Sequence, residues 1–182
     1  LVDAVSWARD LVNTPAGDLP PAALAREAQA MAKEEELTCK VWTEAELKKR
    51  GFGGILGVGQ GSVNPPRLIE LTYKGDGSST PIALTGKGIA FVSGGLSIKD
   101  AKGMETMKID MGGAASILAT MKAIARLKPT YLKIDMGLVR DLHQKKVNQQ
   151  VVKAIQEMGV GVGATVIAEG IQTVEESDAV RA

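Results

Sequence analysis

Cysteine and aromatic residues are scarce in this sequence, and long hydrophobic runs are absent. The one cysteine, Cys39, cannot form an internal disulfide or a thiolate metal cluster, and its place in an alternating segment predicts a half-buried strand residue. Phe, Trp and Tyr make up 3% of the chain, too few for surfaces that stack unpaired bases. No apolar run approaches the roughly 20 residues that a membrane-spanning helix needs.

A strong charge of one sign is also lacking. The 182 residues carry 22 Lys and Arg against 21 Asp and Glu, a net charge of +1, and these charges are scattered. We therefore expect no nucleic-acid and no membrane partner. The amino end has neither a basic start nor a cleavage site, which predicts a cytoplasmic protein. A chain of this length with 45% hydrophobic residues can bury one core and form a single domain.

Local patterns in the first third predict helices and one strand. Apolar residues at helical spacing favour a helix over residues 2–12, and a second helix begins at Pro21, where proline suits a first turn. Residues 38–42 alternate as a strand does. Thr43 followed by glutamate three residues later is a capping box, which predicts a short helix ending near residue 50.

The next segment, residues 51–62, is rich in glycine but is not a dinucleotide fingerprint, because no helix follows its glycines. Residues 67–73 alternate as a strand. Residues 74–77 then predict a turn towards a second strand over residues 81–85. We expect these two strands to be neighbours in one sheet.

Strand and helix patterns alternate through the remainder of the chain, which predicts parallel strands joined by right-handed crossovers. The fold class expected is α/β: a single three-layer α/β/α domain with a mostly parallel or mixed central sheet. The predicted elements are a helix over 114–127 with Ile117, Leu118, Met121, Ile124 and Leu127 on one apolar face, strands over 131–134 and 165–168, and helices over 149–158 and from Thr173.

The glycine-rich stretch from Lys87 to residue 113, with the wording GKGIAFVSGGLSIKDAKG, carries the most specific motif. It closely resembles the leucine aminopeptidase family, whose members are two-metal enzymes. The resemblance implies that Lys87 and Asp110 are metal ligands and that Lys99 is the catalytic lysine that polarises the substrate. The family has aspartate where this chain has Val92, which offers neither charge nor lone pair to a metal ion.

The likeness extends over residues 1 to about 127, through the segments ARDLVNTPAGDLPPAALA, GFGGILGVGQGS and PPRLIELTYKG. From residue 128 the wording changes. PTYLKIDMGLVRDLH, NQQVVKAIQEM and ATVIAEGIQTVEE resemble the EAL domains, which hydrolyse cyclic di-GMP within a (β/α)8 barrel. That second resemblance implies metal-site roles for Asp135 and Glu169 and a water-positioning role for Lys133, with Gln172 where the family has a second glutamate.

Two resemblances in one chain favour a recombined, designed chimera of an aminopeptidase-like fragment (1–127) and an EAL-like fragment (128–182). Because each site is incomplete, the expected function is a folded scaffold without catalysis, in which the site residues are vestigial and no cofactor is bound. An anion held between Lys87 and Lys99 is expected in that case.

Two alternatives stay open. In the first, Asp110, Asp135 and Glu169 converge with Lys99 to leave a residual aminopeptidase that depends on zinc or manganese. In the second, the chain is a remnant that binds cyclic di-GMP. The oligomeric state is also open, and exposed sheet edges make a homo-oligomer one of its alternatives.

Overall fold

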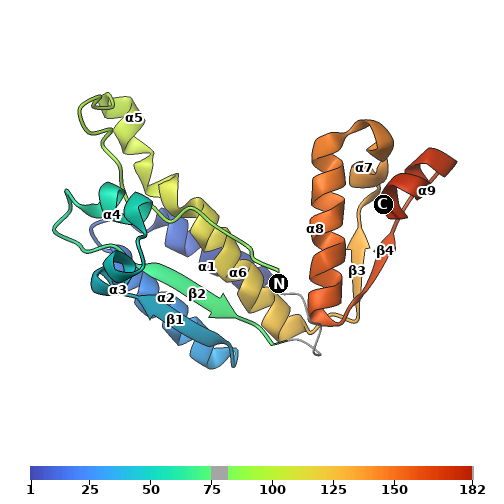
Figure 1. The fold of residues 1–182 in the computed structure, drawn as a ribbon, viewed down its shortest axis with the longest axis horizontal. Coiled ribbons are helices and arrows are strands. Elements are labelled where there is room, and N and C mark those ends of the chain that lie inside the picture. Colours follow the sequence, from blue (N-terminus) through green and yellow to red (C-terminus); the bar gives the residue numbers. More distant parts are fainter. Residues whose placement is uncertain (75–81, 182) are drawn as a thin grey trace. The chain divides into compact units, whose positions relative to one another are not determined.

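The computed structural model describes residues 1–74 and 82–181 (Figure 1). Helices and strands are mixed along the chain, so the predicted α/β class is confirmed. Contacts divide the chain into two compact units, one of Leu1–Tyr73 with Leu84–Leu127 and one made chiefly of residues 128–181. The predicted single domain stays a prediction. Among the described residues, no helix combines the length and the apolar character that crossing a bilayer requires.

The first unit begins with the two predicted helices, α1 (Val2–Asn13) and α2 (Pro21–Glu34). Pro21 occupies the first turn of α2, where its missing N–H costs no hydrogen bond. Both helices bury one apolar face in the core of this unit, with Leu11 from α1 and Met31 from α2 almost fully buried. Both helices therefore contribute to one shared core.

The predicted strand over residues 38–42 is confirmed as β1 (Thr38–Trp42), and it pairs antiparallel with β2 (Leu68–Thr72). Cys39 lies in β1 opposite Leu71 and is half-buried, as predicted. The capping box is also confirmed. Thr43 Oγ1 accepts a hydrogen bond from the N–H of Glu46, and the Glu46 carboxylate accepts one from the N–H of Thr43. The helix α3 (Glu44–Lys49) begins at this capping box.

The glycine-rich segment after α3 contains a short helix, α4 (Gly53–Gly59), that the sequence did not predict. Glycine is a weak helix former, but α4 packs against α3, and this contact stabilises it. The chain after α4 folds back closely. A Cβ on Gly59 would lie 2.9 Å from Pro66, so glycine is required at this position.

The prediction of one central sheet is wrong for the described residues, which form two separate two-stranded sheets. Residues 82–85 form no strand, and Pro81 and the predicted turn at 75–77 lie outside the described residues. Instead of pairing with β2, this segment leads to the start of α6 (Gly112–Leu127), where the N–H of Ala114 donates to the carbonyl of Lys87 at 2.8 Å. Local alternation could not reveal that β2 pairs with β1.

The long connection between residues 86 and 113, called the crossing below, leads into α6. It contains two short helical segments, α5 (Ala101–Glu105) and η1 (Met107–Met111). α6 confirms the predicted helix, but its buried face differs from the predicted one. Leu118 is buried as expected, whereas Leu127 is 56% exposed. The buried positions of α6 are mostly small, namely Ala115, Leu118, Ala119 and Ala125. Small side chains allow α6 to pack closely against α1.

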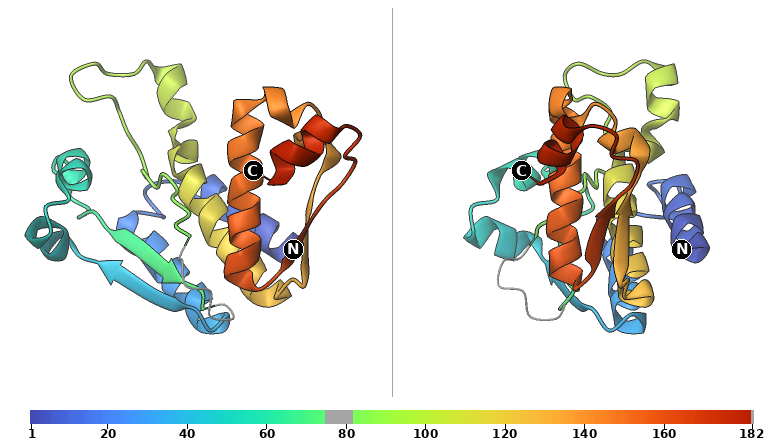
Figure 2. Two further views of the ribbon diagram at one scale, coloured as in Figure 1. Left: turned by 45° about the vertical axis from the view of Figure 1, so that its right-hand side comes forward. Right: turned by 90° about the vertical axis from the view of Figure 1, so that its right-hand side faces the viewer.

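The second unit contains the two predicted strands, β3 (Tyr131–Ile134) and β4 (Thr165–Ala168), which pair in parallel (Figure 2). The helix between them, α8 (Lys146–Val162), is longer than predicted and packs on both strands. Gly163 ends α8 in the left-handed conformation, with φ 71°. The unit is completed by the short helices α7 (Met136–Val139) and η2 (Leu142–Gln144) and by the terminal helix α9 (Val174–Arg181).

A buried carboxylate fastens α9 to the second unit. Glu176 is 1% exposed, and its oxygens accept from the N–H groups of Asp141 at 3.0 Å and Gln172 at 2.8 Å. Thr173 caps the helix by accepting from the N–H of Glu176, as the sequence predicted. A buried carboxylate is tolerated here because backbone N–H groups replace the hydrogen bonds that water would otherwise donate to it.

Candidate functional site

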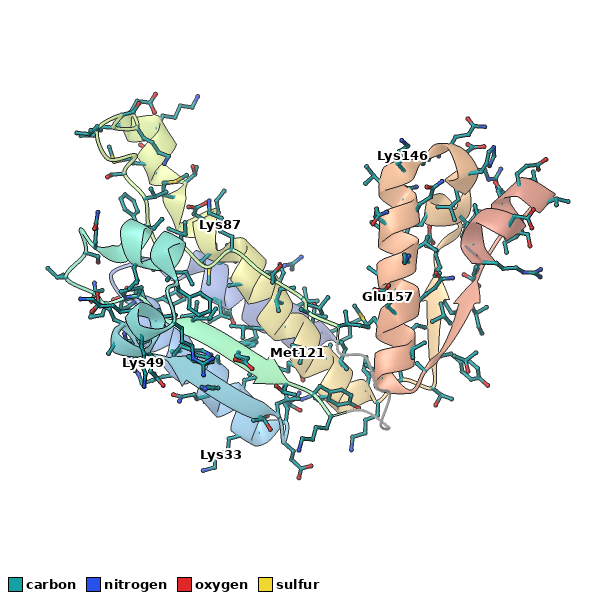
Figure 3. All side chains as sticks on the ribbon, viewed as in Figure 1. Lys33, Lys49, Lys87, Met121, Lys146 and Glu157 are labelled. Carbon is teal, nitrogen blue, oxygen red and sulfur yellow. The ribbon has the colours of Figure 1, made fainter. Side chains whose placement is uncertain are left out.

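The crossing between residues 86 and 113 lies directly on the first turn of α6, and glycines make this contact feasible. A Cβ on Gly86 would lie 2.4 Å from the carbonyl oxygen of Gly113, and one on Gly113 would lie 2.8 Å from the N–H nitrogen of Lys87. Any larger residue would push the two backbones apart. Figure 3 shows Lys87 on the stretch beside α6. This close approach positions Lys87 next to the residues that precede α6.

Lys87 and Asp110, both predicted as metal ligands, are brought together although 23 positions separate them. The Lys87 ammonium lies 2.7 Å from Asp110 Oδ1, in an ion pair whose side chains are 60% and 17% exposed respectively. The other carboxylate oxygen, Asp110 Oδ2, is buried and has no hydrogen-bond partner among the described residues. An unpaired buried carboxylate oxygen is costly unless a cation or water completes it, so Asp110 has an acceptor available for a ligand.

Lys99 is held by a tight turn that starts at Ser93. The N–H of Lys99 donates to the carbonyl of Ser93 at 2.8 Å, and the Lys99 ammonium donates to the carbonyl of Val92 at 3.0 Å. Gly94 has φ 99°, and a Cβ there would lie 2.2 Å from the carbonyl oxygen of Ser97. Glycine is thus needed to close the turn, and the closed turn fixes the direction of Lys99.

Val92 is half-buried and contributes only its backbone carbonyl to this turn. A side chain without lone pairs cannot bind a cation, so the substitution leaves Asp110 as the single carboxylate that the predicted ligands supply here. The described residues contain no group of three or more His, Cys, Asp and Glu side chains that could hold a metal ion. The residues present therefore fit one edge of a metal site, through Asp110 Oδ2, but not a full ligand set.

Asp135 and Glu169 lie at the carboxyl ends of β3 and β4, within the second unit. Asp135 caps α7 by accepting from the N–H of Gly137 at 2.7 Å. Glu169 pairs with Lys133, and both side chains of that pair are about half exposed. Each acid thus has a local structural contact, and their assignment as metal ligands stays a prediction.

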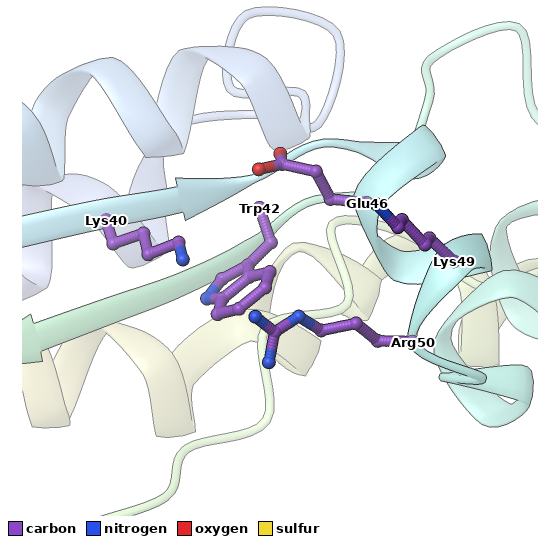
Figure 4. A pocket seen from close by; sticks show the side chains of 5 residues that line it. All are labelled: Lys40, Trp42, Glu46, Lys49 and Arg50. Atoms are coloured by element: carbon purple, nitrogen blue, oxygen red, sulfur yellow. The ribbon is translucent and has the colours of Figure 1, made fainter.

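The first unit also contains a basic pocket that was not predicted from the sequence (Figure 4). It is lined by Lys40, Trp42, Glu46, Lys49 and Arg50. One signal was present: residues two apart in a strand share a face, so Lys40 and Trp42 must point the same way from β1. The return of α3 over that face could not be read from local patterns.

Comparison with known proteins decides the family. Residues 6–170 match the family model described as "Cytosol aminopeptidase family, catalytic domain". The chain belongs to the cytosol aminopeptidase family. Membership agrees with the resemblance to leucine aminopeptidases that the loop around Lys87, Lys99 and Asp110 carries.

Curated and solved relatives support this assignment. A probable cytosol aminopeptidase of Leifsonia xyli is 49% identical over 128 residues, which is 70% of this chain and 26% of that protein. The apo structure of a leucyl aminopeptidase from Trypanosoma cruzi superimposes with a TM-score of 0.64 at 41% identity, over 68% of this chain and 24% of that one. The bottromycin maturation enzyme BotP, solved in complex with Mn, gives a TM-score of 0.61 at 44% identity over 69% and 27%. The chain thus spans about a quarter of the length of the relatives it matches.

These findings correct the prediction of a designed chimera that serves as a non-catalytic scaffold. The match to the cytosol aminopeptidase family continues to residue 170, past the proposed joint at residues 127 and 128, and nothing in the comparisons supports an EAL fragment. A physical reason explains the error. A short strand followed by an acidic residue and a helix occurs in α/β proteins generally, so blocks such as YLKID and VIAEG identify a βα unit better than a family.

Proposed function

We propose that this chain contributes to a metal-dependent aminopeptidase, which hydrolyses the first peptide bond of a peptide. Membership of the cytosol aminopeptidase family supports the reaction class. The ion pair between Lys87 and Asp110, with the second Asp110 oxygen left without a partner, is the observation that carries the proposal. It brings together the two residues that the family resemblance names as metal ligands.

Asp110 would hold a divalent ion, zinc or manganese, and Lys87 would join it as a ligand only after its ammonium releases a proton to solvent, because a protonated amine has no lone pair. Because Lys87 is 60% exposed, its ion pair contributes at most about 1 kcal/mol to stability, and a competing cation at Asp110 would have little to overcome. A relative, BotP, was solved in complex with Mn. When bound, such an ion supplies Lewis-acid polarisation of the scissile carbonyl and a water that loses its proton near neutral pH. Because Val92 supplies no carboxylate and Asp110 is the single one among the predicted ligands here, we expect weak metal affinity.

Lys99 is proposed as the residue that polarises the substrate. An ammonium has three N–H donors, and in the structure one of them is used by the carbonyl of Val92. The others can donate to the carbonyl oxygen of the peptide bond, on which negative charge grows as the carbonyl is attacked. A fixed donor of this kind typically accounts for about 10²–10³ in rate. The glycine-closed turn from Ser93 provides the fixed position.

Location and partners follow from the same proposal. We place the activity in the cytoplasm, where the family description and the names of the relatives place theirs. A homo-oligomer and the absence of nucleic-acid and membrane partners stay predictions. Light scattering of the purified chain tests the oligomeric state.

The experiment is hydrolysis of leucine p-nitroanilide by the full chain, with manganese or zinc added and with the metal removed by chelation. We expect metal-dependent release of the amine, a loss of about 10²-fold or more in Lys99→Met, and a loss in Asp110→Asn. Lys102→Met is the matched control, because Lys102 is an exposed lysine of α5 on the same crossing. No release above background with either metal, or equal rates in Lys99→Met and Lys102→Met, would show that the proposal is wrong.

A further inference from the structure

A basic pocket of about 280 Å³ lies at the end of β1, built from residues outside the crossing that carries Lys87 and Lys99. Lys40 and Trp42 reach it from one face of β1 (Figure 4). The capping box at Thr43 then starts α3, whose last turn brings Lys49 and Arg50 to the same place. Four residues that are close in sequence thus surround one hollow because a strand passes directly into a helix.

Trp42 organises the cations of this pocket. The indole is 8% exposed, and its Nε1 donates to Glu70 on β2 at 2.9 Å, which fixes the ring. The Lys40 ammonium lies 3.6 Å from the ring centroid, and the guanidinium carbon of Arg50 lies 4.3 Å from it. Attraction to the electron-rich ring holds two like charges near each other despite their repulsion. The pocket is therefore preorganised in the absence of a ligand.

The pocket keeps an excess of positive charge. No carboxylate of the described residues forms an ion pair with Lys40, Lys49 or Arg50. The lining carboxylate, Glu46, has one oxygen engaged by the N–H and the hydroxyl of Thr43. Hydrogen bonds from the Thr43 backbone and side chain, aided by the nearby Lys40 and Arg50, hold the pKa of Glu46 below its ordinary value, so it stays ionised at neutral pH. The lining residues, three cations and one carboxylate, carry a net charge of +2, and Glu70, which accepts from Trp42 and lies opposite Lys40 on β2, reduces the local net charge to +1.

We propose that this pocket binds a small organic phosphate. A phosphate monoester carries about −1.5 to −2 charges at pH 7, opposite in sign to the excess charge of the pocket. The planar fork of Arg50 suits the paired oxygens of a phosphate, and the two lysines add point charges around it. Drug-sized ligands occupy pockets of roughly 300–1,000 Å³, so a volume of about 280 Å³ suits a ligand of the size of glycerol 3-phosphate.

Tryptophan fluorescence tests the proposal directly, because the chain has two tryptophans and Trp7→Phe leaves Trp42 as the only reporter. Glycerol 3-phosphate is titrated into the full-length Trp7→Phe chain at constant ionic strength, so that general screening does not change. We expect a saturable change in emission. Adding Arg50→Gln should weaken binding about tenfold or more, since a hydrogen bond to a charged group is worth roughly 1.5–3 kcal/mol.

Two further variants keep the test decisive. The Lys49 side chain makes no hydrogen bond or ring contact among the described residues, so Lys49→Gln removes charge without disturbing Trp42, and it should also weaken binding. Lys48→Gln is the matched control on the same helix, outside the pocket, and should change affinity by no more than about twofold. These variants leave Lys87, Lys99 and Asp110 intact, so a failed titration is distinguishable from a failed aminopeptidase.

Three results would overturn the assignment. The first is a change that does not saturate, or that sodium acetate reproduces at equal ionic strength. The second is an equal loss in Lys48→Gln and Arg50→Gln while both retain the circular dichroism of the parent. The third is tighter binding of a single-stranded oligonucleotide than of glycerol 3-phosphate at equal phosphate concentration, which would point to a polymer ligand.

Discussion

Arg126, near the end of α6, lies 2.5 Å through its Nε from Glu35 Oε1, at the end of α2. The same guanidinium contacts Glu34 at 2.6 Å and Asp3 at 3.3 Å, so one side chain joins three segments of the first unit. The hydrogen bond that Arg126 Nε donates to Glu35, aided by the neighbouring carboxylates, raises the pKa of Arg126 above its ordinary value. Charge pairing therefore adds to the apolar contacts that hold α6, and hence the turn that precedes it, in place.

Replacing this arginine tests that role. We expect Arg126→Ala to lower the thermal midpoint by a few degrees at low salt, because three carboxylates lose their shared partner. The difference should shrink in about 1 M salt, where the Debye length falls to about 3 Å. Arg9→Ala, at an exposed position of α1, is the control and should leave the midpoint unchanged. An equal shift at low and high salt would show that Arg126 acts through packing alone.

A substitution in the core of the second unit should lower stability more than Arg126→Ala does. Leu142 is fully buried against Ile134, Val139 and Val152. Leu142→Ala should therefore cost about 2–5 kcal/mol of unfolding free energy, from lost burial and the cavity that remains. Val147→Ala, at a site 76% exposed, should change it by no more than about 0.5 kcal/mol. Urea unfolding followed by circular dichroism measures both.

The same variant tests whether the chain is a single domain. Both tryptophans, Trp7 and Trp42, lie in the first unit. If the predicted single domain holds, Leu142→Ala shifts the urea midpoint of tryptophan fluorescence together with that of circular dichroism. A fluorescence midpoint that stays at the wild-type value would show that the two units unfold separately.

Much of the secondary structure could be predicted because its signals are local. Pro21, the capping box at Thr43 and the cap at Thr173 each act within one helical turn, and each begins the helix that the sequence indicated. The partner of β2 could not be predicted in this way, because strand pairing depends on contacts between distant residues. The helix α4 was missed for a similar reason, since packing against α3 outweighs its glycines.

For the candidate site and the basic pocket, too, local signals were predictable and contacts between distant residues were not. The pairing of Lys87 with Asp110 was expected only through the family resemblance, because its physical cause is the close approach of Gly86 to Gly113 across the chain. The pocket around Trp42 had a partial local signal in the spacing of Lys40 and Trp42, but Arg50 joins it through the tertiary position of α3. Sequence patterns thus located the elements, while contacts between them made both sites.

Acid should weaken the attachment of α9. The N–H of Gln172, followed by that of Asp141, holds the pKa of Glu176 below its ordinary value. A carboxylate with a lowered folded-state pKa stabilises the fold above its unfolded pKa, about 4.3 for glutamate, and this stability is lost as pH falls through the folded pKa. As the pH falls from neutral through the unfolded pKa to the folded-state pKa of Glu176, we expect Glu176→Gln to lose less unfolding free energy than wild type.

Chemical unfolding at a series of pH values measures this dependence, with Glu157→Gln on the exposed face of α8 as the matched control. The control should follow the wild-type curve. A Glu176→Gln curve parallel to wild type throughout the acid range would show that the backbone hydrogen bonds to Glu176 do not favour its ionised form.

Direct binding of manganese, measured by isothermal calorimetry, tests the central claim that Asp110 is part of a metal site. We predict weak binding to wild type, a loss of about tenfold or more in Asp110→Asn, and no loss in Glu105→Gln, an exposed acid of the same crossing. Val92→Asp should strengthen binding about tenfold or more, since it supplies the carboxylate that Val92 lacks. Absence of heat from both wild type and Val92→Asp, or undiminished binding in Asp110→Asn, would contradict the account.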